Sequence, residues 1–274
     1  MAIFRCRALG ARSLSRDIRR ACLGWLLVVT LLAAAPAHAD YPVAPDVVVF
    51  CEPTLRYAMT DIAALWRSES GVKARIFTAP TTALLLAEIA HHARDDVVIG
   101  EGDANTAAAK TQQLIKPDSL HPLGRNHLVI AAVSGSAAAA NGGDSLAAIA
   151  GKETVAIVDP WAAAAGADSK QALQSLGLWQ KVSAKSIGVG GTADAAFLLS
   201  QGKARLAIIY ATDVAANPEF TIVERLPASS YPPVVYWVAE ATRALSPNAA
   251  KFIAFLTSIR ARDRLRADGI EVSP

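Results

Sequence analysis

The chain has 274 residues, of which 53% are hydrophobic, and its 27 basic residues stand against 24 acidic ones. This length can fill one large hydrophobic core or two modest ones. The net charge of +3 comes from residues 1–39, which hold six arginines and one acid; the remaining chain has 21 basic and 23 acidic residues, a net charge of −2. The charge balance therefore gives no reason to expect nucleic acid as a partner.

The first 39 residues have the order of a secretory signal. The basic segment "MAIFRCRALGARSLSRDIRR" is followed by the apolar run "ACLGWLLVVTLLAAAPA" and by "AHA" before Asp40. A basic segment, a short apolar core and small residues at a cleavage site are typical of such a signal, and the apolar run is too short for a membrane span. We therefore expect cleavage after Ala39 and export to the periplasm.

The three cysteines allow no intrachain disulfide after export. Cys6 and Cys22 lie in the predicted signal, so that Cys51 alone remains, and one cysteine has no partner within its own chain. We expect Cys51 to pack as a small buried side chain beside a strand.

Short apolar strands alternate with amphipathic helices in the part that follows Asp40. The first series predicts strands over 46–50, 72–77 and 96–100, with helices over 55–70 and 82–94 between them. Continuous apolar strands between helices favour a parallel sheet that is covered on both faces.

A second series follows the same pattern. It predicts strands over 127–133, 154–159, 185–189 and 204–210, with helices near 166–176 and 192–201. The last part holds a strand in "VVYWVAEAT" and one or two helices, the first of which begins at Ser246-Pro247, a serine cap followed by proline. The sequence thus predicts two α/β lobes.

Four predicted strands run into helices through loops with small residues or threonines. In "VDPWAAAAG" alanines and a glycine leave the first turn of the helix uncovered, and the free N–H groups of such a turn can hold an anion. Similar turns stand at Thr54, at Thr81 or Thr82, and at Thr192. Each threonine is also an ordinary helix cap, but ligands of open α/β sheets collect at these strand ends.

Several of these segments resemble the periplasmic molybdate-binding proteins. The segment "IVDPWAAAAGADSKQALQSLGLWQKV" is similar to the family's Gly-Asp-Pro and Pro-Ala-Gly stretch with a helix that ends Leu-Gly-x-Trp. The segment "TADAAFLLSQGKARLAIIYATDVA" is similar to the helix and strand that come next in the family. The resemblance covers nearly all of residues 46–274, and its most specific part is 157–214.

The resemblance implies a two-lobed periplasmic binding protein fold of type II, in which each lobe is a sheet flanked by helices. The first lobe would comprise 40–126 together with 236–274, and the second lobe 127–235. Two crossing strands near 126–129 and 232–237 would form the hinge, and the ligand would lie between the lobes.

The family holds a tetrahedral oxyanion with neutral donors, and the resemblance places these donors on numbered residues. The first lobe would contribute Thr54 and either Thr81 or Thr82, with a hydroxyl and an N–H each. The second lobe would contribute the backbone N–H groups of Ala165 and Thr192 and the phenol of Tyr210. Neutral donors suffice for an anion when each of its oxygens is fully hydrogen-bonded.

The resemblance further implies a monomer that binds molybdate or tungstate and delivers it to the membrane permease of an ABC transporter. No cofactor, bare metal cation or catalytic residue is expected. Alternatives are a diverged binding protein for another oxyanion or a small organic acid, and a sensor or accessory protein. An enzyme would need a nucleophile with a base in reach, and no histidine of the exported part lies near a candidate serine in the sequence.

Four positions depart from the family pattern. Glu52 brings a carboxylate next to Thr54, and this carboxylate would oppose an anion unless it points to solvent. Pro80 stands where a serine is usual and has no N–H. Ala164 replaces a proline, and Trp161 adds a bulky side chain to the loop. These changes affect the expected ligand more than the expected fold.

Overall fold

The computed structural model describes residues 46–91, 94–140 and 153–272, all within one compact unit, Val43–Pro274. The predicted signal, its cleavage site and Cys22 lie outside the described residues. Among the helices that are described, none is long and apolar enough to cross a membrane.

The first sheet has the strand order β2-β1-β3-β10-β4. Strands β1 (Val47–Cys51), β2 (Ala74–Thr78) and β3 (Val97–Glu101) run parallel, whereas β10 (Val234–Glu240) is antiparallel to β3 and to β4 (His121–Asn126). Because β1 and β3 are parallel neighbours, their carboxyl ends lie at the same edge of the sheet. This edge carries the first half of the candidate site.

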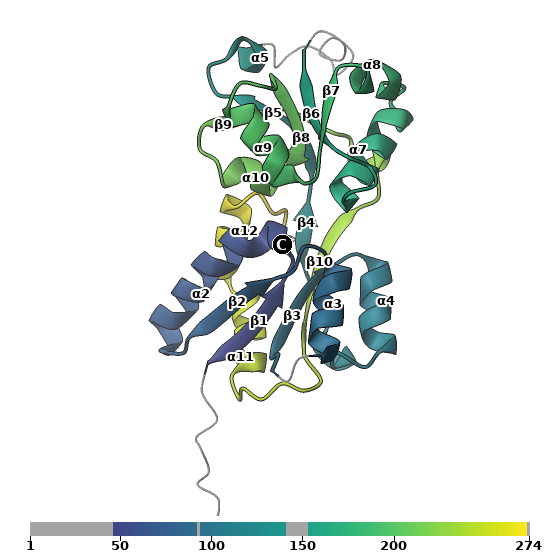
Figure 1. Cartoon of the computed structure of the whole chain (residues 1–274). Coiled ribbons are helices and arrows are strands. Elements are labelled where there is room, and N and C mark those ends of the chain that lie inside the picture. Colours follow the sequence, from purple (N-terminus) through teal and green to yellow (C-terminus); the bar gives the residue numbers. More distant parts are fainter. Residues whose placement is uncertain (1–45, 92–93, 141–152, 273–274) are drawn as a thin grey trace, which may run out of the picture. The chain divides into compact units, whose positions relative to one another are not determined.

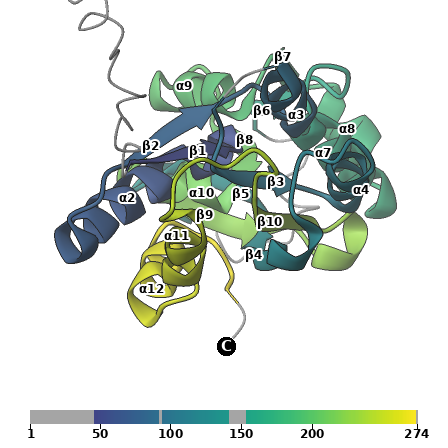
Figure 2. The ribbon, with the colours of Figure 1, turned by 90° about the horizontal axis from the view of Figure 1, so that it is seen from below.

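Helices cover both faces of the first sheet (Figures 1 and 2). Val47, Val49 and Ile99 pack with α2 (Arg56–Ser70) and α11 (Ala249–Leu256) on one face, and α12 (Ile259–Ala267) packs on α2. Val98 and Trp237 pack with α3 (Thr82–His91) on the other face, next to α4 (Asp103–Thr111). The alternation of side chains along each strand explains this division.

The second sheet has the order β7-β6-β8-β5-β9. Its strands are β5 (Leu128–Val133), β6 (Val155–Val158), β7 (Ser186–Val189), β8 (Leu206–Tyr210) and β9 (Phe220–Arg225). Strands β6, β7 and β8 are parallel, and β5 is antiparallel to both of its neighbours.

Two helices lie on opposite faces of the second sheet. Along β8, Leu206, Ile208 and Tyr210 share a cluster with α7 (Ala164–Ser175), whereas Ala207 and Ile209 share one with α9 (Thr192–Ser200). The remaining short helices of the described chain are η1 (Pro53–Leu55), η2 (Pro117–Ser119), α5 (Ala137–Ala140), α8 (Trp179–Ser183), α10 (Ala211–Ala215) and η3 (Ala228–Ser230).

The two predicted α/β lobes are confirmed as two sheets flanked by helices, but the sheets are mixed rather than parallel. The chain leaves the first sheet after β4, builds the second sheet, and returns in β10, so that a strand from the far end of the sequence joins β3 in antiparallel fashion. The apolar pattern of the sequence did not predict α4, β4 and β9. Strand β4, "HPLGRN", contains proline and glycine and has no apolar alternation.

Candidate functional site

Thr54 lies in η1, directly after β1, and contacts a buried tyrosine of β10. Its Oγ1 is 2.7 Å from the hydroxyl of Tyr236, a residue with 0% exposure. The same phenol accepts a hydrogen bond from Nδ2 of Asn126 at 2.9 Å. Because the phenol accepts from Asn126, its own proton can go to Thr54, which leaves the Thr54 hydroxyl proton available for a ligand.

Asn126 joins the two sheets at the point where the chain passes from β4 to β5. Its Oδ1 accepts from the N–H of His127 at 2.9 Å, which defines the orientation of the amide, and its Nδ2 also donates to Oγ1 of Thr212 in α10 at 3.0 Å. No local sequence pattern distinguishes a single asparagine between two strands, so this role of Asn126 could not be predicted from the sequence.

The two candidate threonines at the start of α3 have different environments. Thr81 accepts a hydrogen bond from the N–H of Leu84 through its hydroxyl, at 3.2 Å, and so caps the helix. Thr82 is 2% exposed; its hydroxyl donates to Oε1 of Glu52 at 2.6 Å and accepts from the N–H of Glu101 at 3.1 Å. The single hydroxyl proton of Thr82 is therefore already used by Glu52.

Thr192 and Tyr210 are linked through Asp213. The hydroxyl of Thr192 donates to Oδ1 of Asp213 at 3.2 Å, and the N–H of Tyr210 donates to Oδ2 at 2.9 Å. Burial raises the pKa of Asp213 to about 6, against the lowering effect of these two hydrogen bonds. Asp213 thereby ties the start of α9 to the end of β8, and this leaves the backbone N–H of Thr192 as its free donor.

Helix α7 begins without a side-chain cap. Its N-cap is Ala163, in extended conformation, and no side chain accepts a hydrogen bond from the first turn. Gly166 makes the turn possible, since a Cβ there would lie 2.3 Å from the carbonyl oxygen of Asp159. In this turn the N–H of Gly166 donates to the Ala163 carbonyl at 3.0 Å, whereas no described group accepts from the N–H of Ala165. Trp161, in the same loop, is 91% exposed.

Three carboxyl groups lie near these donors. Glu52 is 7% exposed, so it does not point to solvent, and burial raises its pKa. Burial and the charges of Glu52 and Asp168 raise the pKa of Glu101 to about 8. Burial raises the pKa of Asp168 to about 6. The pKa of Tyr210 is raised by burial and then by Glu101, Tyr236, Asp168 and Glu52, so these groups belong to one neighbourhood.

Cys51 is buried beside its strand, as the sequence suggested. Burial first, and then the charge of Glu52, raises the pKa of the Cys51 thiol to about 12, against a lowering effect of Arg56; the thiol is therefore protonated and a weak nucleophile. The guanidinium of exposed Arg56 stacks over the ring of Tyr57 at 4.8 Å. Within the described chain, no group of three or more histidine, cysteine or acidic residues could hold a metal ion.

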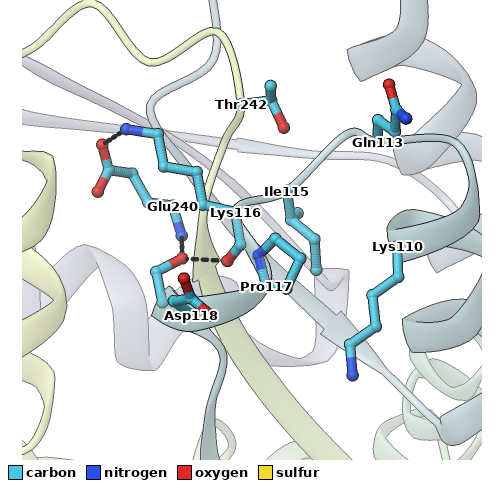
Figure 3. A pocket seen from close by; sticks show the side chains of 9 residues that line it. Lys110, Gln113, Ile115, Lys116, Pro117, Asp118, Glu240 and Thr242 are labelled. Atoms are coloured by element: carbon cyan, nitrogen blue, oxygen red, sulfur yellow. Dashed lines mark hydrogen bonds and ion pairs between the residues drawn. The ribbon is translucent and has the colours of Figure 1, made fainter.

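A surface pocket of about 620 Å³ lies apart from these residues (Figure 3). It is lined by the end of α4, by η2 and by the end of β10, including Lys110, Lys116 and Glu240. Lys116 forms an ion pair with Glu240, so its charge is already compensated. None of the sequence-predicted site residues lines this pocket.

Residues 47–271 match the family model described as bacterial extracellular solute-binding protein. The chain belongs to this family. The solute-binding protein is 27% identical over 230 residues to the molybdate-binding protein ModA of Escherichia coli (strain K12). The aligned residues cover 78% of this chain and 85% of that protein. It is thus related to the molybdate-binding proteins, as the sequence resemblance implied.

Solved structures show the same fold. The periplasmic molybdate-binding protein of Azotobacter vinelandii has a TM-score of 0.69 at 19% identity, covering 83% of this chain and 100% of that chain. Iron-bound HitA of Pseudomonas aeruginosa has a TM-score of 0.56 at 13% identity, covering 80% and 83%. The two-lobed binding protein fold is therefore confirmed, and at these identities the likeness concerns the fold alone.

The structure of the solute-binding protein brings part of the predicted set together. Thr54, Thr82 and Tyr210 lie in the neighbourhood of Glu52, Glu101 and Tyr236, and Thr192 joins them through Asp213. Ala165 is placed by α7, the helix that also carries Asp168. Thr81 instead caps α3. Glu101, Asp168 and Asn126 were not predicted from the sequence, because the surroundings of each depend on segments that are distant in the chain.

Proposed function

We propose that this protein is the periplasmic solute-binding component of an ABC importer and that it holds a tetrahedral oxyanion, molybdate or tungstate, between its two sheets. The observation that carries the proposal is the uncapped start of two helices, α7 and α9. Their N-caps are Ala163 and Gly191, and neither helix start receives a side-chain hydrogen bond. Such first turns present free N–H groups and the positive end of the helix dipole to an anion.

The proposed donors come from both sheets. Thr54 offers its hydroxyl proton, and Thr82 offers its backbone N–H because its hydroxyl is bonded to Glu52. Ala165 and Thr192 offer backbone N–H groups, and Tyr210 offers its phenol. Sequence similarity to a molybdate-binding protein supports the choice of oxyanion. Delivery to a membrane permease, a monomeric state and the absence of catalysis are part of the same proposal.

One observation favours a second candidate. Glu52 is buried beside Thr54 and Thr82, where a carboxylate opposes a dianion. A diverged protein of this kind could bind an anion with less negative charge, such as a small organic acid with a hydroxyl group. Such a ligand would accept from the helix starts and donate to the carboxyl groups.

A thermal-melting screen of the purified protein tests the function. With molybdate or tungstate at about a hundredfold excess over Kd, we expect the melting temperature to rise by about 5 to 10 °C, and sulfate and phosphate to give smaller shifts. Thr54→Ala should remove most of the shift. The matched control is Thr60→Ala at an exposed position of α2, where the hydroxyl donates to the Arg56 carbonyl. A shift that persists in Thr54→Ala would contradict the site, and shifts with organic acids alone would favour the second candidate.

A further inference from the structure

Two carboxyl groups of the candidate site have no hydrogen-bond partner. Glu101 ends β3 in the first sheet, and Asp168 lies on α7 at the second sheet. The backbone N–H and carbonyl of Glu101 are bonded to Thr82 and Asn105, but within the described residues no hydrogen bond or ion pair reaches the carboxyl of Glu101 or of Asp168. Both groups are partly buried. No oxygen of either carboxyl is among the fully buried atoms without a partner in the described residues, so both carboxyl groups are accessible to solvent or to a solute that enters the site.

The groups that face Glu101 provide no positive charge. Glu52 after β1 and Asp168 on α7 act on it as negative charges, and Glu101 acts in turn on Tyr210 of β8 and Tyr236 of β10. From α3 it meets the neutral hydroxyl of Thr82. Helix α4, which follows β3 in the chain, begins at Asp103, an exposed acidic residue.

The surroundings of Asp168 are similar. Its charge acts on Glu101, Tyr210 and Tyr231. Lys170 on the same helix lies over the rings of Trp161 and Trp179, at 5.9 and 5.7 Å from their centroids. Arg225 of β9 lowers the pKa of Tyr231. No cation is among the groups that lower the pKa of Glu101 or of Tyr210; the causes of both shifts are burial and neighbouring acidic or phenolic groups.

The available donors are fewer than the sequence suggested. The hydroxyl protons of Thr82 and Thr192 are used by Glu52 and Asp213. Tyr210 is 3% exposed, and its phenol is the hydroxyl donor that remains in the predicted set besides Thr54. A tetrahedral oxyanion held by this phenol and Thr54 would lie in the neighbourhood of Glu101 and Asp168, since the charges of both carboxyl groups act on Tyr210.

We propose that Glu101 and Asp168 bind the oxyanion as protonated carboxyl groups, so that the protein takes up its solute together with protons. A neutral carboxyl group in an apolar site donates a hydrogen bond, whereas an ionised one repels a dianion. The protons come from solvent and stay on the carboxyl oxygens; no covalent bond forms or breaks. The inference rests on the proposed function and specifies how its site accepts negative charge.

The direct test is calorimetric titration of the protein with molybdate at about pH 6 and about pH 8.5, in buffers of different ionisation enthalpy. Each required proton costs about tenfold in affinity per pH unit above the pKa of its group. We expect the Kd to rise on the order of 100-fold between the two pH values, with at least about one proton taken up per molybdate at the higher pH.

Glu101→Gln and Asp168→Asn separate this role from a structural one. An amide donates without needing a proton from solvent, so each variant should bind molybdate more tightly than the parent protein at the higher pH and take up fewer protons. Asp103→Asn, at an exposed carboxyl group, should keep the pH dependence of the parent.

The outcomes distinguish the two proposals. Molybdate binding with the same Kd at both pH values, or without proton uptake, would overturn the protonated carboxyl groups and leave the oxyanion function standing. No binding of molybdate or tungstate at either pH would overturn the oxyanion function itself. A solute that binds more tightly as the pH rises would show that the carboxyl groups act in their ionised form.

Discussion

The hydroxyls of Tyr236 and Thr54 lie 2.7 Å apart, although 182 residues separate them in the sequence. Tyr236 belongs to the strand that returns from the second sheet, and Asn126, at the first passage between the sheets, donates to the same phenol. The first ligand loop is therefore hydrogen-bonded to the two connecting strands. Movement of one sheet relative to the other would act on the orientation of the Thr54 hydroxyl.

Tyr236→Phe should weaken oxyanion binding while the fold is kept. The ring still fills its buried position, but Thr54 loses the donor that orients it, and one hydrogen bond contributes about 1 kcal/mol. We expect the Kd for molybdate to rise about fivefold in a calorimetric titration. Tyr57→Phe removes a phenol that is on the surface, in a side chain with 58% exposure, and should leave the Kd unchanged. Equal Kd values for the two variants would show that the phenol of Tyr236 does not position Thr54.

Gly166→Ala should disrupt the start of α7. The added Cβ would lie 2.3 Å from the Asp159 oxygen and 2.7 Å from the Val158 oxygen, and these backbone atoms cannot move without shifting the loop that carries the Ala165 N–H. We expect a loss of about 2 to 4 kcal/mol in unfolding free energy and weaker oxyanion binding. Gly188→Ala is the matched control, because a Cβ at Gly188 meets nothing within 4 Å. Denaturant unfolding followed by circular dichroism compares the two; a neutral Gly166→Ala would contradict this account of the turn.

Asp96→Ala should be strongly destabilising. Asp96 is 0% exposed and accepts hydrogen bonds from the N–H groups of Val48, Leu245 and Ser246, each at 2.8 Å. Its removal leaves three N–H donors, two of them in buried hydrogen bonds, without their acceptor, so we expect a loss of about 3 to 5 kcal/mol. The midpoint of urea unfolding measures this loss. Asp118→Ala, at an exposed residue of η2, should change the midpoint little, and a similar effect of both substitutions would be evidence against the Asp96 network.

Glu101 should make the stability of the unliganded protein depend on pH. Its pKa of about 8 in the folded protein exceeds the ordinary value of 4.5, so between these values the folded state binds more protons than the unfolded one. The free energy of unfolding therefore falls as the pH rises through this window. In Glu101→Gln this contribution is absent, and we expect its melting temperature, relative to that of the parent, to rise from pH 5 to pH 8. A constant difference between the two proteins would mean that Glu101 titrates near its ordinary value.

The local pattern of the chain determined much of this protein. Apolar runs and their bounding residues predicted eight of the ten strands of the described chain, such as β1, and the helices α2, α3, α7 and α9, because hydrophobic periodicity and caps act over a few residues. The family resemblance pointed to Thr54, Ala165, Thr192 and Tyr210 as site residues, and each of them stands at a strand end or a helix start.

Only the tertiary structure decided the chemistry around these residues. Strand β10 pairs with β3, which places Tyr236 opposite Glu101, and the packing of α3 brings Thr82 to Glu52 at 2.6 Å. These contacts join segments that are far apart in the sequence, and the direction of a side chain such as Glu52 follows from strand pairing and burial. Whether a carboxyl group is solvated, paired or buried among other acids depends on such long-range contacts, because desolvation and nearby charges set its pKa.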